Sequence, residues 1–350
     1  MRIMIVTNSS TGGGAERSMN LVANELVALG HTVLLVPINR GPDDEVTLTC
    51  KVACLNRKWR GGLMSVLVAA IRFNFLAIHF RPTTVILNCD LPEFLGCFLI
   101  FRRIFVGVEH VNYPWVQRPY LGKLVRRFLN FRKIKWVAVS DHLSIWPDNR
   151  RPIKTIVNPI IAKRNESAPL RNSAKGITIK RIVFIGRLVD QKRPDWILEI
   201  CKSANLPGLI IGEGELSPTL KNFVDSNEMP IEFAGQVQLP WEMIGEGDLL
   251  IVSSAYEGDG LVVVEALQQQ VPFLLSNIPE FRRFDFSENV YCSSIGDFTQ
   301  RVEKYRENLD SLLASKEKKD QILMNRRIDK IGQEWITFLA NNFGDRTNGD

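Results

Sequence analysis

The sequence predicts an α/β protein with two doubly wound domains in tandem, and three observations favour this fold class. Strand-like apolar runs open two similar segments, at 2–7 (RIMIVT) and 181–186 (RIVFIG), and each run is followed by a loop and a helical pattern. Short apolar runs then alternate with helical patterns, which is typical of parallel sheets. The length of 350 residues is ordinary for two domains.

The predicted elements follow in order along the chain. Strands are expected at short apolar or β-branched runs, namely 2–7, 32–38, 83–88, 104–108, 135–139, 181–186, 208–212, 231–234, 248–253 and 272–276. Helical patterns lie between many of them, notably at 61–80, 116–133, 215–227 and 261–270. Open parallel sheets bind ligands beyond the carboxyl ends of their strands, so the loops after the strands are the places to search for chemistry.

A polar segment divides the chain. Residues 161–176 contain Pro169 and Gly176 and show no apolar periodicity, which is typical of an interdomain linker. The apolar residues near the C-terminus are again at helical spacing. We therefore expect a first domain, a linker, a second domain and a C-terminal helix at 1–165, 166–178, 179–320 and 321–345, respectively.

Composition excludes several classes of protein. The longest apolar runs, 64–79 and 94–106, are interrupted by arginines and are too short to span a bilayer. The start of the chain lacks the features of a secretory signal, so we expect a cytoplasmic protein. The six cysteines contain no C-x-x-C and the four histidines add no zinc spacing, which disfavours structural zinc and a disulfide framework.

The charge is distributed unevenly. Residues 1–160 hold 21 Lys and Arg against 10 Asp and Glu, whereas the other 190 residues hold 23 against 28. In 123–135 the basic residues interleave with apolar ones, which is typical of a helix on an anionic membrane surface. A solvated basic helix face packed on its own domain explains this segment equally well. Nucleic acid is not an expected partner, because no recognition motif accompanies the charge.

Residues 253–267 carry the sharpest signal for chemistry. A strand ends at Ser253, a loop with two glycines follows, and a helical pattern begins near Leu261. Such a loop directs backbone N–H groups and the positive end of a helix at a bound phosphate. Glu257 lies in the loop, and Glu265 lies about one turn into the helix, near a sugar hydroxyl. The alternative is a surface loop with two solvated glutamates.

Two further loops are candidates for binding a phosphate. Arg187 and Lys192 follow the strand at 181–186 and can both reach one diphosphate, although such side chains are usually solvated. The triple glycine Gly12–Gly14 opens the first helix and permits close approach of a ligand, although a tight turn needs glycine as well. This glycine loop is neither G-x-G-x-x-G nor a P-loop.

Together these residues resemble the retaining nucleotide-sugar glycosyltransferases of the GT-B fold, specifically glycosyltransferase family 4. The shared motifs are GGAER at 13–17, Val139-Ser140, Val157-Asn158-Pro159, GRL with Lys192 at 186–192, IGEGE at 211–215, FAGQV at 233–237 and E-x7-E from Glu257 to Glu265. The resemblance implies two Rossmann-like domains with the active site in the cleft between them. It also implies that the last helix returns to the first domain.

The resemblance implies roles for residues of the second domain. Arg187 and Lys192 would hold the donor diphosphate and stabilise its charge as it leaves. Glu257 would contact the donor sugar. The remaining donor-binding residues implied there are Gly212, Val237, Gly260, Leu261 and Glu265, with Gly260 and Leu261 near the diphosphate and Glu265 at the ribose.

In the first domain, the resemblance implies that Gly13 and Gly14 border the donor phosphates and that His110 helps to position the donor sugar. Judged alone, a histidine after a strand is more often structural. No D-x-D occurs in the sequence, which agrees with a metal-independent reaction without a cofactor beyond the donor itself. We assign no covalent nucleophile.

The sequence departs from the family pattern at two notable positions. Asp259 places an additional carboxylate in the donor loop, where the family commonly has an aromatic or apolar residue. Gln270 stands where the family has a glycine, which often ends a helix in a left-handed conformation. The first change bears on the choice of donor, and the second is expected to cost about 1 kcal/mol.

The leading hypothesis is a cytoplasmic glycosyltransferase of hexosyltransferase type, peripheral on the inner face of the membrane. It would build a surface polysaccharide, such as a lipopolysaccharide or a capsule, on a lipid-linked saccharide acceptor. One alternative is a sugar-nucleotide epimerase, because one such group shares this two-domain fold. The other is a non-catalytic protein that binds nucleotide sugars.

Overall fold

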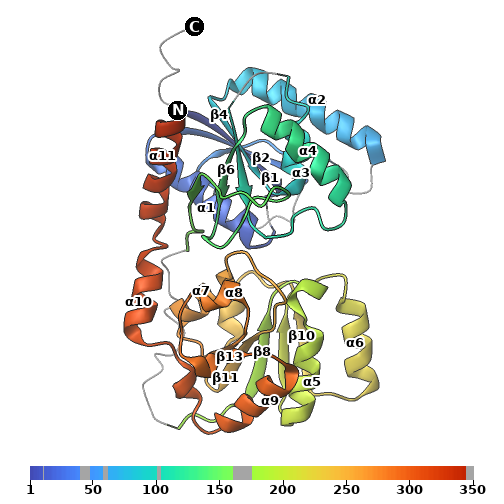
Figure 1. The fold of residues 1–350 in the computed structure, drawn as a ribbon. Coiled ribbons are helices and arrows are strands. Elements are labelled where there is room, and N and C mark those ends of the chain that lie inside the picture. Colours follow the sequence, from blue (N-terminus) through green and yellow to red (C-terminus); the bar gives the residue numbers. More distant parts are fainter. Residues whose placement is uncertain (11, 40–47, 58–61, 101–103, 161–175, 344–350) are drawn as a thin grey trace. The chain divides into compact units, whose positions relative to one another are not determined.

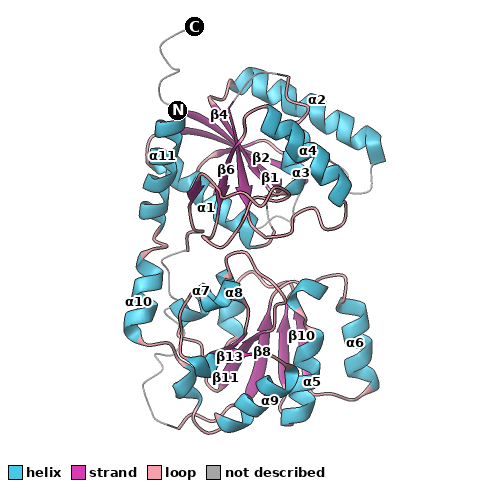
Figure 2. Ribbon diagram, in the orientation of Figure 1, coloured by secondary structure: helices cyan, strands magenta, loops and turns pink. Residues whose placement is uncertain are grey.

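The computed structural model describes all residues except 11, 40–47, 58–61, 101–103, 161–175 and 344–350 (Figure 1). The chain divides into two compact units. Unit 1 comprises Met1–Ile161 and Asn325–Asp350, and unit 2 comprises Ala162–Met324. Each unit combines helices with a parallel sheet (Figure 2), so the predicted fold class of two doubly wound α/β domains is confirmed.

Unit 1 contains a seven-stranded parallel sheet in the order β3-β2-β1-β4-β5-β6-β7. Its strands are β1 (Arg2–Ser9), β2 (Thr32–Asn39), β3 (Lys51–Val52), β4 (Thr84–Asn88), β5 (Ile104–Glu109), β6 (Lys135–Ala138) and β7 (Lys154–Thr155). The sequence order reverses between β1 and β4, which is the switch point of such sheets. The two-residue strands β3 and β7 were not expected, because they are too short to show an apolar pattern.

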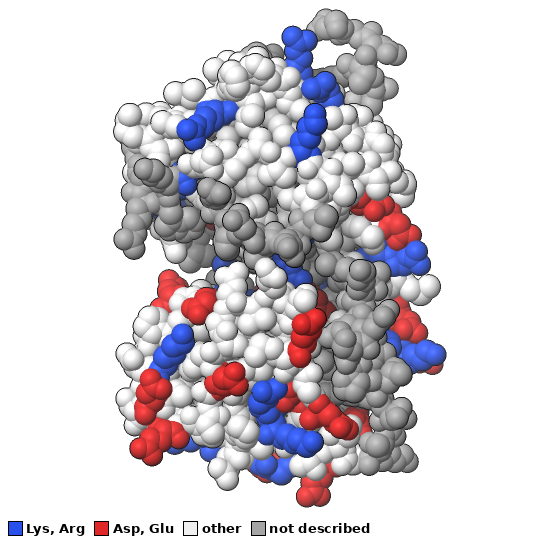
Figure 3. Space-filling model, turned by 180° about the vertical axis from the view of Figure 1, so that it is seen from behind, with Lys and Arg blue, Asp and Glu red and all other residues white. Residues whose placement is uncertain are grey.

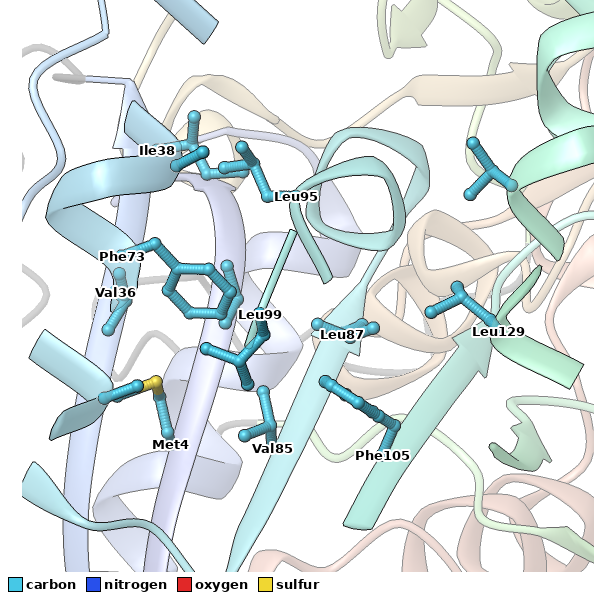
Figure 4. Close-up of a cluster of buried hydrophobic side chains, with 14 of the residues drawn as sticks. Met4, Val36, Ile38, Phe73, Val85, Leu87, Leu95, Leu99, Phe105 and Leu129 are labelled. Atoms are coloured by element: carbon cyan, nitrogen blue, oxygen red, sulfur yellow. The ribbon is translucent and has the colours of Figure 1, made fainter. Parts of the chain in front are cut away.

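Helices cover both faces of this sheet. They are α1 (Gly14–Ala28), α2 (Gly62–Phe80), α3 (Asp90–Gly96), α4 (Pro119–Phe131) and α11 (Ile328–Phe343). Successive residues of a strand point to opposite faces, so β1 is apolar throughout. Met4 contributes to a core with Phe73 of α2 and Leu129 of α4 (Figure 4). Ile5 contributes to the other core, which contains Trp335 of α11.

An ion-pair network lies inside unit 1. Nε and Nη2 of Arg126 donate to the two carboxylate oxygens of Glu93 at 2.9 and 2.6 Å, and Nη1 donates to Glu109 at 2.5 Å. The indole N–H of Trp115 also donates to Glu93, at 2.9 Å. All three charged side chains are at most 1% exposed. This network ties α3 and α4 to the end of β5.

Unit 2 contains a six-stranded parallel sheet in the order β10-β9-β8-β11-β12-β13. Its strands are β8 (Arg181–Ile185), β9 (Gly208–Ile211), β10 (Ile231–Gly235), β11 (Asp248–Val252), β12 (Phe273–Ser276) and β13 (Tyr291–Cys292). The sequence order reverses between β8 and β11, as it does between β1 and β4 of unit 1. Both sheets therefore have the strand order of a doubly wound domain.

The helices of unit 2 lie between these strands and after the last of them. The α-helices are α5 (Asp195–Ala204), α6 (Ser217–Ser226), α7 (Leu261–Gln269), α8 (Pro279–Arg282), α9 (Ile295–Lys304) and α10 (Lys316–Met324). Four short 3-10 helices are η1 (Asp190–Lys192), η2 (Pro240–Met243), η3 (Glu288–Val290) and η4 (Leu309–Leu312). Across the described residues of both units, no helix is long and apolar enough to cross a membrane.

The C-terminal segment consists of two helices where the sequence predicts one over 321–345. Helix α10 ends at Met324, and α11 begins at Ile328. The side chain of Arg326 between them is 3% exposed and donates to the carbonyl oxygen of Asn158 at 3.0 Å. The N–H of Ile160 donates to the carbonyl of Arg326 at 3.1 Å. These bonds replace a turn of helix, and α11 then packs beside α1 within unit 1.

Candidate active site

The carboxyl ends of the strands in unit 2 hold most of the predicted site residues. The loop after β8 contains Arg187 and Lys192, and the loop after β11 contains Glu257. Because β8 and β11 pair directly, their loops leave the sheet side by side. The strand order reverses at this pair, which is where open parallel sheets bind ligands.

Hydrogen bonds join these two loops. The N–H of Ala255 donates to the carbonyl of Gln191 at 2.8 Å, and the side-chain amide of Gln191 donates to the carbonyl of Tyr256 at 3.0 Å. The hydroxyl of Ser253, which is fully buried, donates to the carbonyl of Lys192 at 2.9 Å. The position of one loop therefore fixes the position of the other.

Lys192 and Glu257 form an ion pair at this junction. Nζ of Lys192 donates to Oε1 of Glu257, which also accepts a hydrogen bond from the hydroxyl of Ser254 at 2.8 Å. The side chain of Glu257 is 7% exposed and that of Lys192 is 19% exposed. Two donors on one oxygen fix the orientation of the carboxylate. Residues 65 positions apart in the sequence are thus brought into direct contact.

Arg187 is exposed at the start of the same loop. Burial raises the pKa of the Tyr256 hydroxyl above its ordinary value, and the positive charge of Arg187 acts in the opposite direction. Arg187 thus acts electrostatically on Tyr256, which precedes Glu257 in the sequence. An exposed guanidinium offers paired N–H donors that match the oxygens of a diphosphate.

Helix α7 begins where the loop after β11 ends. Gly260 precedes it with φ of +61°, and a Cβ there would lie 3.0 Å from the ring of Phe281, so this helix start favours glycine. The backbone N–H groups from Leu261 onward form the positive end of the helix. One turn later, Glu265 accepts a hydrogen bond from the indole N–H of Trp241 at 2.9 Å.

The additional carboxylate of Asp259 is paired within unit 2. Nη2 of Arg283 donates both to Oδ1 of Asp259 and to its backbone carbonyl, each at 2.6 Å. The side chain of Asp259 is 3% exposed. Its negative charge is therefore paired with the guanidinium of Arg283.

Two predicted donor-binding residues have packing roles in the structure. Gly212 has φ of +137°, and a Cβ there would lie 1.9 Å from the carbonyl oxygen of Gly186. Only glycine lets the loops after β8 and β9 approach this closely. Val237 packs against a small buried cluster that includes Val183. The donor contacts of Gly212 and Val237 stay predictions.

In unit 1 the predicted residues lie at the carboxyl ends of strands as well. Gly13 precedes α1, which begins at Gly14. The carboxylate of Glu16 in the first turn is buried and accepts a hydrogen bond from Nδ2 of Asn8 at 3.3 Å. A carboxylate is stabilised by the positive end of a helix. The start of α1 therefore already carries one negative group beside the position expected for a phosphate.

His110 follows β5 directly and contacts a residue that the sequence analysis missed. Nε2 of His110 lies 2.6 Å from Oδ1 of Asn88, which ends β4. Nδ2 of Asn88 lies 3.4 Å from the carbonyl oxygen of Ala15 in α1. Asn88 is fully buried, so its amide links three segments at the switch point of unit 1. The available signal was a polar residue at the end of an otherwise apolar strand.

The predicted residues thus fall into one group in each unit. Arg187, Lys192 and Glu257 belong to unit 2, whereas His110 and the glycine loop belong to unit 1. Other polar residues hold these groups in place and were not predicted: Asn88, Gln191, Trp241, Ser254, Tyr256 and Arg283.

No group of three or more His, Cys, Asp or Glu side chains in the described ranges is arranged to hold a metal ion. Metal independence stays a prediction from the sequence. The six cysteines are free thiols. Burial raises the pKa of Cys201 to about 12, which keeps this thiol protonated and unreactive at neutral pH.

Solved structures with this architecture define the class: the chain has the GT-B fold of glycosyltransferases. Sucrose-phosphate synthase from Thermosynechococcus elongatus is similar with a TM-score of 0.76 and 14% identity, over 98% of this chain and 99% of that one. The structure of HepE from Anabaena in complex with UDP-glucose is similar with a TM-score of 0.75 and 14% identity, over 97% of this chain and 100% of that one. The lipopolysaccharide outer core galactosyltransferase WaaB is similar with a TM-score of 0.64 and 13% identity, over 98% of this chain and 100% of that one.

A family model matches the second half of the chain. Residues 171–329 match the model described as Glycosyl transferases group 1. This match spans the strands β8 to β13 and all of the site residues of unit 2. The matched segment covers most of unit 2. A search of curated proteins finds no match.

Proposed function

We propose that the chain is a retaining glycosyltransferase of family 4 that moves a hexose from a nucleotide diphosphate sugar to a hydroxyl of a saccharide acceptor. The observation that carries this proposal is the junction of two loops in unit 2. There Lys192 of one loop pairs with Glu257 of the other, and Arg187 is exposed in the same loop as Lys192. This junction lies inside the segment that matches the Glycosyl transferases group 1 model. The structure of HepE, which has a similar fold, contains UDP-glucose.

Arg187 and Lys192 supply positive charge where negative charge develops. As the bond between the sugar and the diphosphate breaks, charge accumulates on the phosphate oxygens, and fixed cations stabilise that transition state. Lys192 carries three N–H donors, so it can keep its contact with Glu257 while donating to a phosphate. Arg187 can bind two oxygens at once. The backbone at the start of α7, from Leu261, adds N–H groups of the same polarity.

The remaining residues of the proposal orient the donor. Glu257, held by two donors, accepts hydrogen bonds from hydroxyls of the donor sugar, and Glu265 accepts one from the ribose. From unit 1, Gly13 and Gly14 border the phosphates and His110 positions the sugar. No residue is assigned as a covalent nucleophile, and the charge on the leaving diphosphate is balanced by side chains without a metal ion.

The acceptor in this proposal is a lipid-linked saccharide that becomes part of a cell-surface polysaccharide. One protein of similar fold, WaaB, is a lipopolysaccharide outer core galactosyltransferase. An acceptor with a lipid anchor requires the enzyme to work at a membrane surface, which here is the cytoplasmic face. The positive charge of residues 1–160 favours attachment to anionic lipid.

Nucleotide binding tests the donor site. Thermal unfolding is measured with UDP, GDP, ADP and dTDP, with and without a chelator. A ligand at about 100 times its Kd adds about 2.7 kcal/mol of stability. We expect stabilisation by one nucleotide, unchanged by the chelator, lost in Arg187→Ala and retained in Arg301→Ala, which removes an arginine from α9. Stabilisation by none of the four nucleotides contradicts the proposal.

Product analysis tests the reaction. The donor that carries the stabilising nucleotide is incubated with lipid extract, and the products are examined by mass spectrometry and NMR. A transferase moves the sugar to the acceptor with retention at the anomeric carbon, and Glu257→Gln abolishes the product. Isomerisation of the donor sugar identifies an epimerase instead. Cellular function that survives both Glu257→Gln and Arg187→Ala identifies a non-catalytic protein.

A further inference from the structure

We propose that unit 1 docks on an anionic lipid bilayer by inserting an exposed apolar stripe of helix α2, with the basic residues of α4 beside it. This inference rests on the membrane attachment proposed above and names the element that enters the lipid. The sequence indicated only the segment 123–135 as a membrane contact. The exposure of α2 was not predictable from its apolar composition, which also suits a buried helix.

Helix α2 is apolar on two opposite faces. One face packs into the core of unit 1 through Val66, Ala69, Ala70, Phe73 and Ala77. The other face is open to solvent, and its large apolar side chains are 42% to 70% exposed: Met64, Leu67, Val68, Ile71, Phe75 and Ile78. Their spacing of three and four residues places them along one stripe. Exposed apolar surface of this extent marks a site of interaction.

The stripe continues across the segment that follows α3. Asn74 of α2 donates from Nδ2 to the carbonyl of Phe98 at 3.0 Å, and its Oδ1 accepts the N–H of Ile100 at 3.0 Å. At the other side of the same segment, Nη1 of Arg132 donates to the carbonyl of Leu99 at 2.8 Å. The side chains of Phe98 and Ile100 are 39% and 79% exposed. This segment therefore joins the α2 stripe to the end of α4.

Helix α4 combines apolar and basic side chains on its solvent face. Leu124, Phe128 and Phe131 are 65%, 43% and 84% exposed. Lys123 and Arg127 are exposed between them. Aromatic rings suit the boundary between headgroups and acyl chains, and Lys and Arg attract anionic headgroups at about 1 kcal/mol each near the surface.

The charge of this part of the chain selects a lipid surface as the partner. Residues 51–140 hold 15 Lys and Arg against only three Asp and Glu. Of these three, Glu93 and Glu109 are at most 1% exposed and are bound to Arg126, and Asp90 accepts the backbone N–H of Trp115. The acidic groups are therefore turned inward. Figure 3 views the chain from behind, and the part of unit 1 seen there also shows Lys and Arg side chains on a mostly uncharged surface.

A second copy of the chain fits this surface less well than a bilayer does. An isologous contact would pair this surface with itself, and the acidic groups of 51–140, which are turned inward, would leave Lys123 and Arg127 without acidic partners there. An anionic bilayer offers negative headgroups to the basic residues and an apolar interior to Ile71 and Phe75. Both features of the surface are then satisfied at once.

Vesicle flotation tests the proposal. The full chain is mixed with vesicles of phosphatidylcholine alone, or of phosphatidylcholine with about one third phosphatidylglycerol. We expect the protein to float with the anionic vesicles and not with the neutral ones. The double variant Ile71→Ser and Phe75→Ser should bind them about tenfold more weakly or worse, because two inserted side chains are lost. The matched control is Phe223→Ser, which removes an exposed phenylalanine from α6 of unit 2 and should bind normally.

Further measurements separate the possible outcomes. Lys123→Gln with Arg127→Gln should weaken binding at low salt and reduce its salt dependence. Equal recovery on neutral and anionic vesicles, absence of binding to both, or unchanged binding of the α2 variant each overturns the proposal. So does a wild-type dimer in light scattering that the α2 variant dissociates. Nucleotide binding is measured on the same samples, so a failed donor site is distinguished from failed docking.

Discussion

Oδ1 of Asn88 lies 2.6 Å from Nε2 of His110, and this contact determines which ring nitrogen carries the proton. The Nδ2 group of Asn88 faces the carbonyl oxygen of Ala15, so the amide oxygen is the atom turned toward the imidazole. That oxygen can only accept, so Nε2 must donate. The neutral ring is therefore the Nε2–H tautomer, and its acceptor atom is Nδ1.

Asn88→Ala is expected to release this constraint. The ring of His110 would then populate both tautomers, and the rate of sugar transfer should fall about tenfold, which corresponds to the loss of one hydrogen bond of about 1.4 kcal/mol. The chain contains four histidines, so nitrogen NMR of the ring resonances can follow His110 directly. The control is Asn227→Ala in unit 2. An unchanged tautomer and an unchanged rate in Asn88→Ala would show that the contact has no role.

The ion pair of Lys192 and Glu257 has a structural and a functional consequence that variants can separate. Lys192→Met leaves the nearly buried Glu257 without its cation, and we expect unit 2 to lose about 1–3 kcal/mol of stability together with nucleotide binding. Adding Glu257→Gln removes the unpaired charge, so urea unfolding should recover much of the stability. Calorimetry should still find no nucleotide binding. Full recovery of binding in the double variant would argue against a phosphate contact by Lys192.

The loops of unit 2 could be predicted because their signals are local. A strand, a glycine-containing loop and a helix follow one another within 253–267, and the same holds for the segment that contains Arg187 and Lys192. The fold class followed from this alternation and is confirmed. The roles of these residues in donor binding stay predictions from the resemblance.

The contacts between distant segments could not be predicted. Asn88 meets His110 because β4 and β5 pair in register, and the sequence contains no signal for which strands pair. Likewise, the break between α10 and α11 depends on Arg326, which bonds to a carbonyl 168 residues away. The sequence of the C-terminal segment predicts one continuous helix over 321–345. Contacts between residues so far apart in the sequence depend on tertiary packing, which local sequence patterns do not encode.

Arg126→Met should destabilise unit 1 severely. The substitution leaves Glu93 and Glu109 buried without a cation, and removal of one partner from a buried ion pair costs about 3–5 kcal/mol. Urea unfolding measures the loss. Arg127→Met is the matched control, because Arg127 is the next residue and is exposed, so its stability should change by less than about 0.5 kcal/mol. Similar unfolding midpoints for the two variants would contradict a structural role of the network.

The stability of unit 1 should also depend on the protonation of Asp90. Burial raises the pKa of Asp90 to about 6, and the nearby Glu93 adds to this effect. The folded state then binds a proton more tightly than the unfolded state, so this group lowers stability as pH rises from about 4 to about 6. The cost is complete above that window and amounts to at most about 3 kcal/mol.

Asp90→Asn removes this cost while its amide oxygen can still accept the N–H of Trp115. We expect the variant to unfold at a higher urea concentration than the wild type above about pH 6, and the difference should shrink toward pH 4. Burial raises the pKa of Glu109 as well, so some dependence of the same sign persists in the variant. Asp225→Asn, at an exposed position of α6, serves as the control. A constant difference at all pH values would indicate a cause other than protonation.

Gln270 ends helix α7 in a left-handed conformation, with φ of +58° and ψ of +39°. Its N–H donates to the carbonyl of Leu267, and the N–H of Val271 donates to that of Ala266 at 2.9 Å, so the backbone closes the helix as a glycine would. A residue with a Cβ is strained in this conformation. Gln270→Gly should therefore stabilise unit 2 by about 0.5–1 kcal/mol, after the entropy that glycine gains in the unfolded chain is subtracted. Thermal unfolding measures the gain.

The neighbouring position makes this prediction specific to the helix end. Gln269 is still helical, so Gln269→Gly should destabilise the same helix by about 1 kcal/mol. The same substitution at adjacent positions thus has opposite signs, because only Gln270 has positive φ. Destabilisation by both variants would mean that the side chain of Gln270 makes contacts that outweigh its backbone strain. The position of α7, whose first residues lie in the proposed donor site, would then depend on this glutamine.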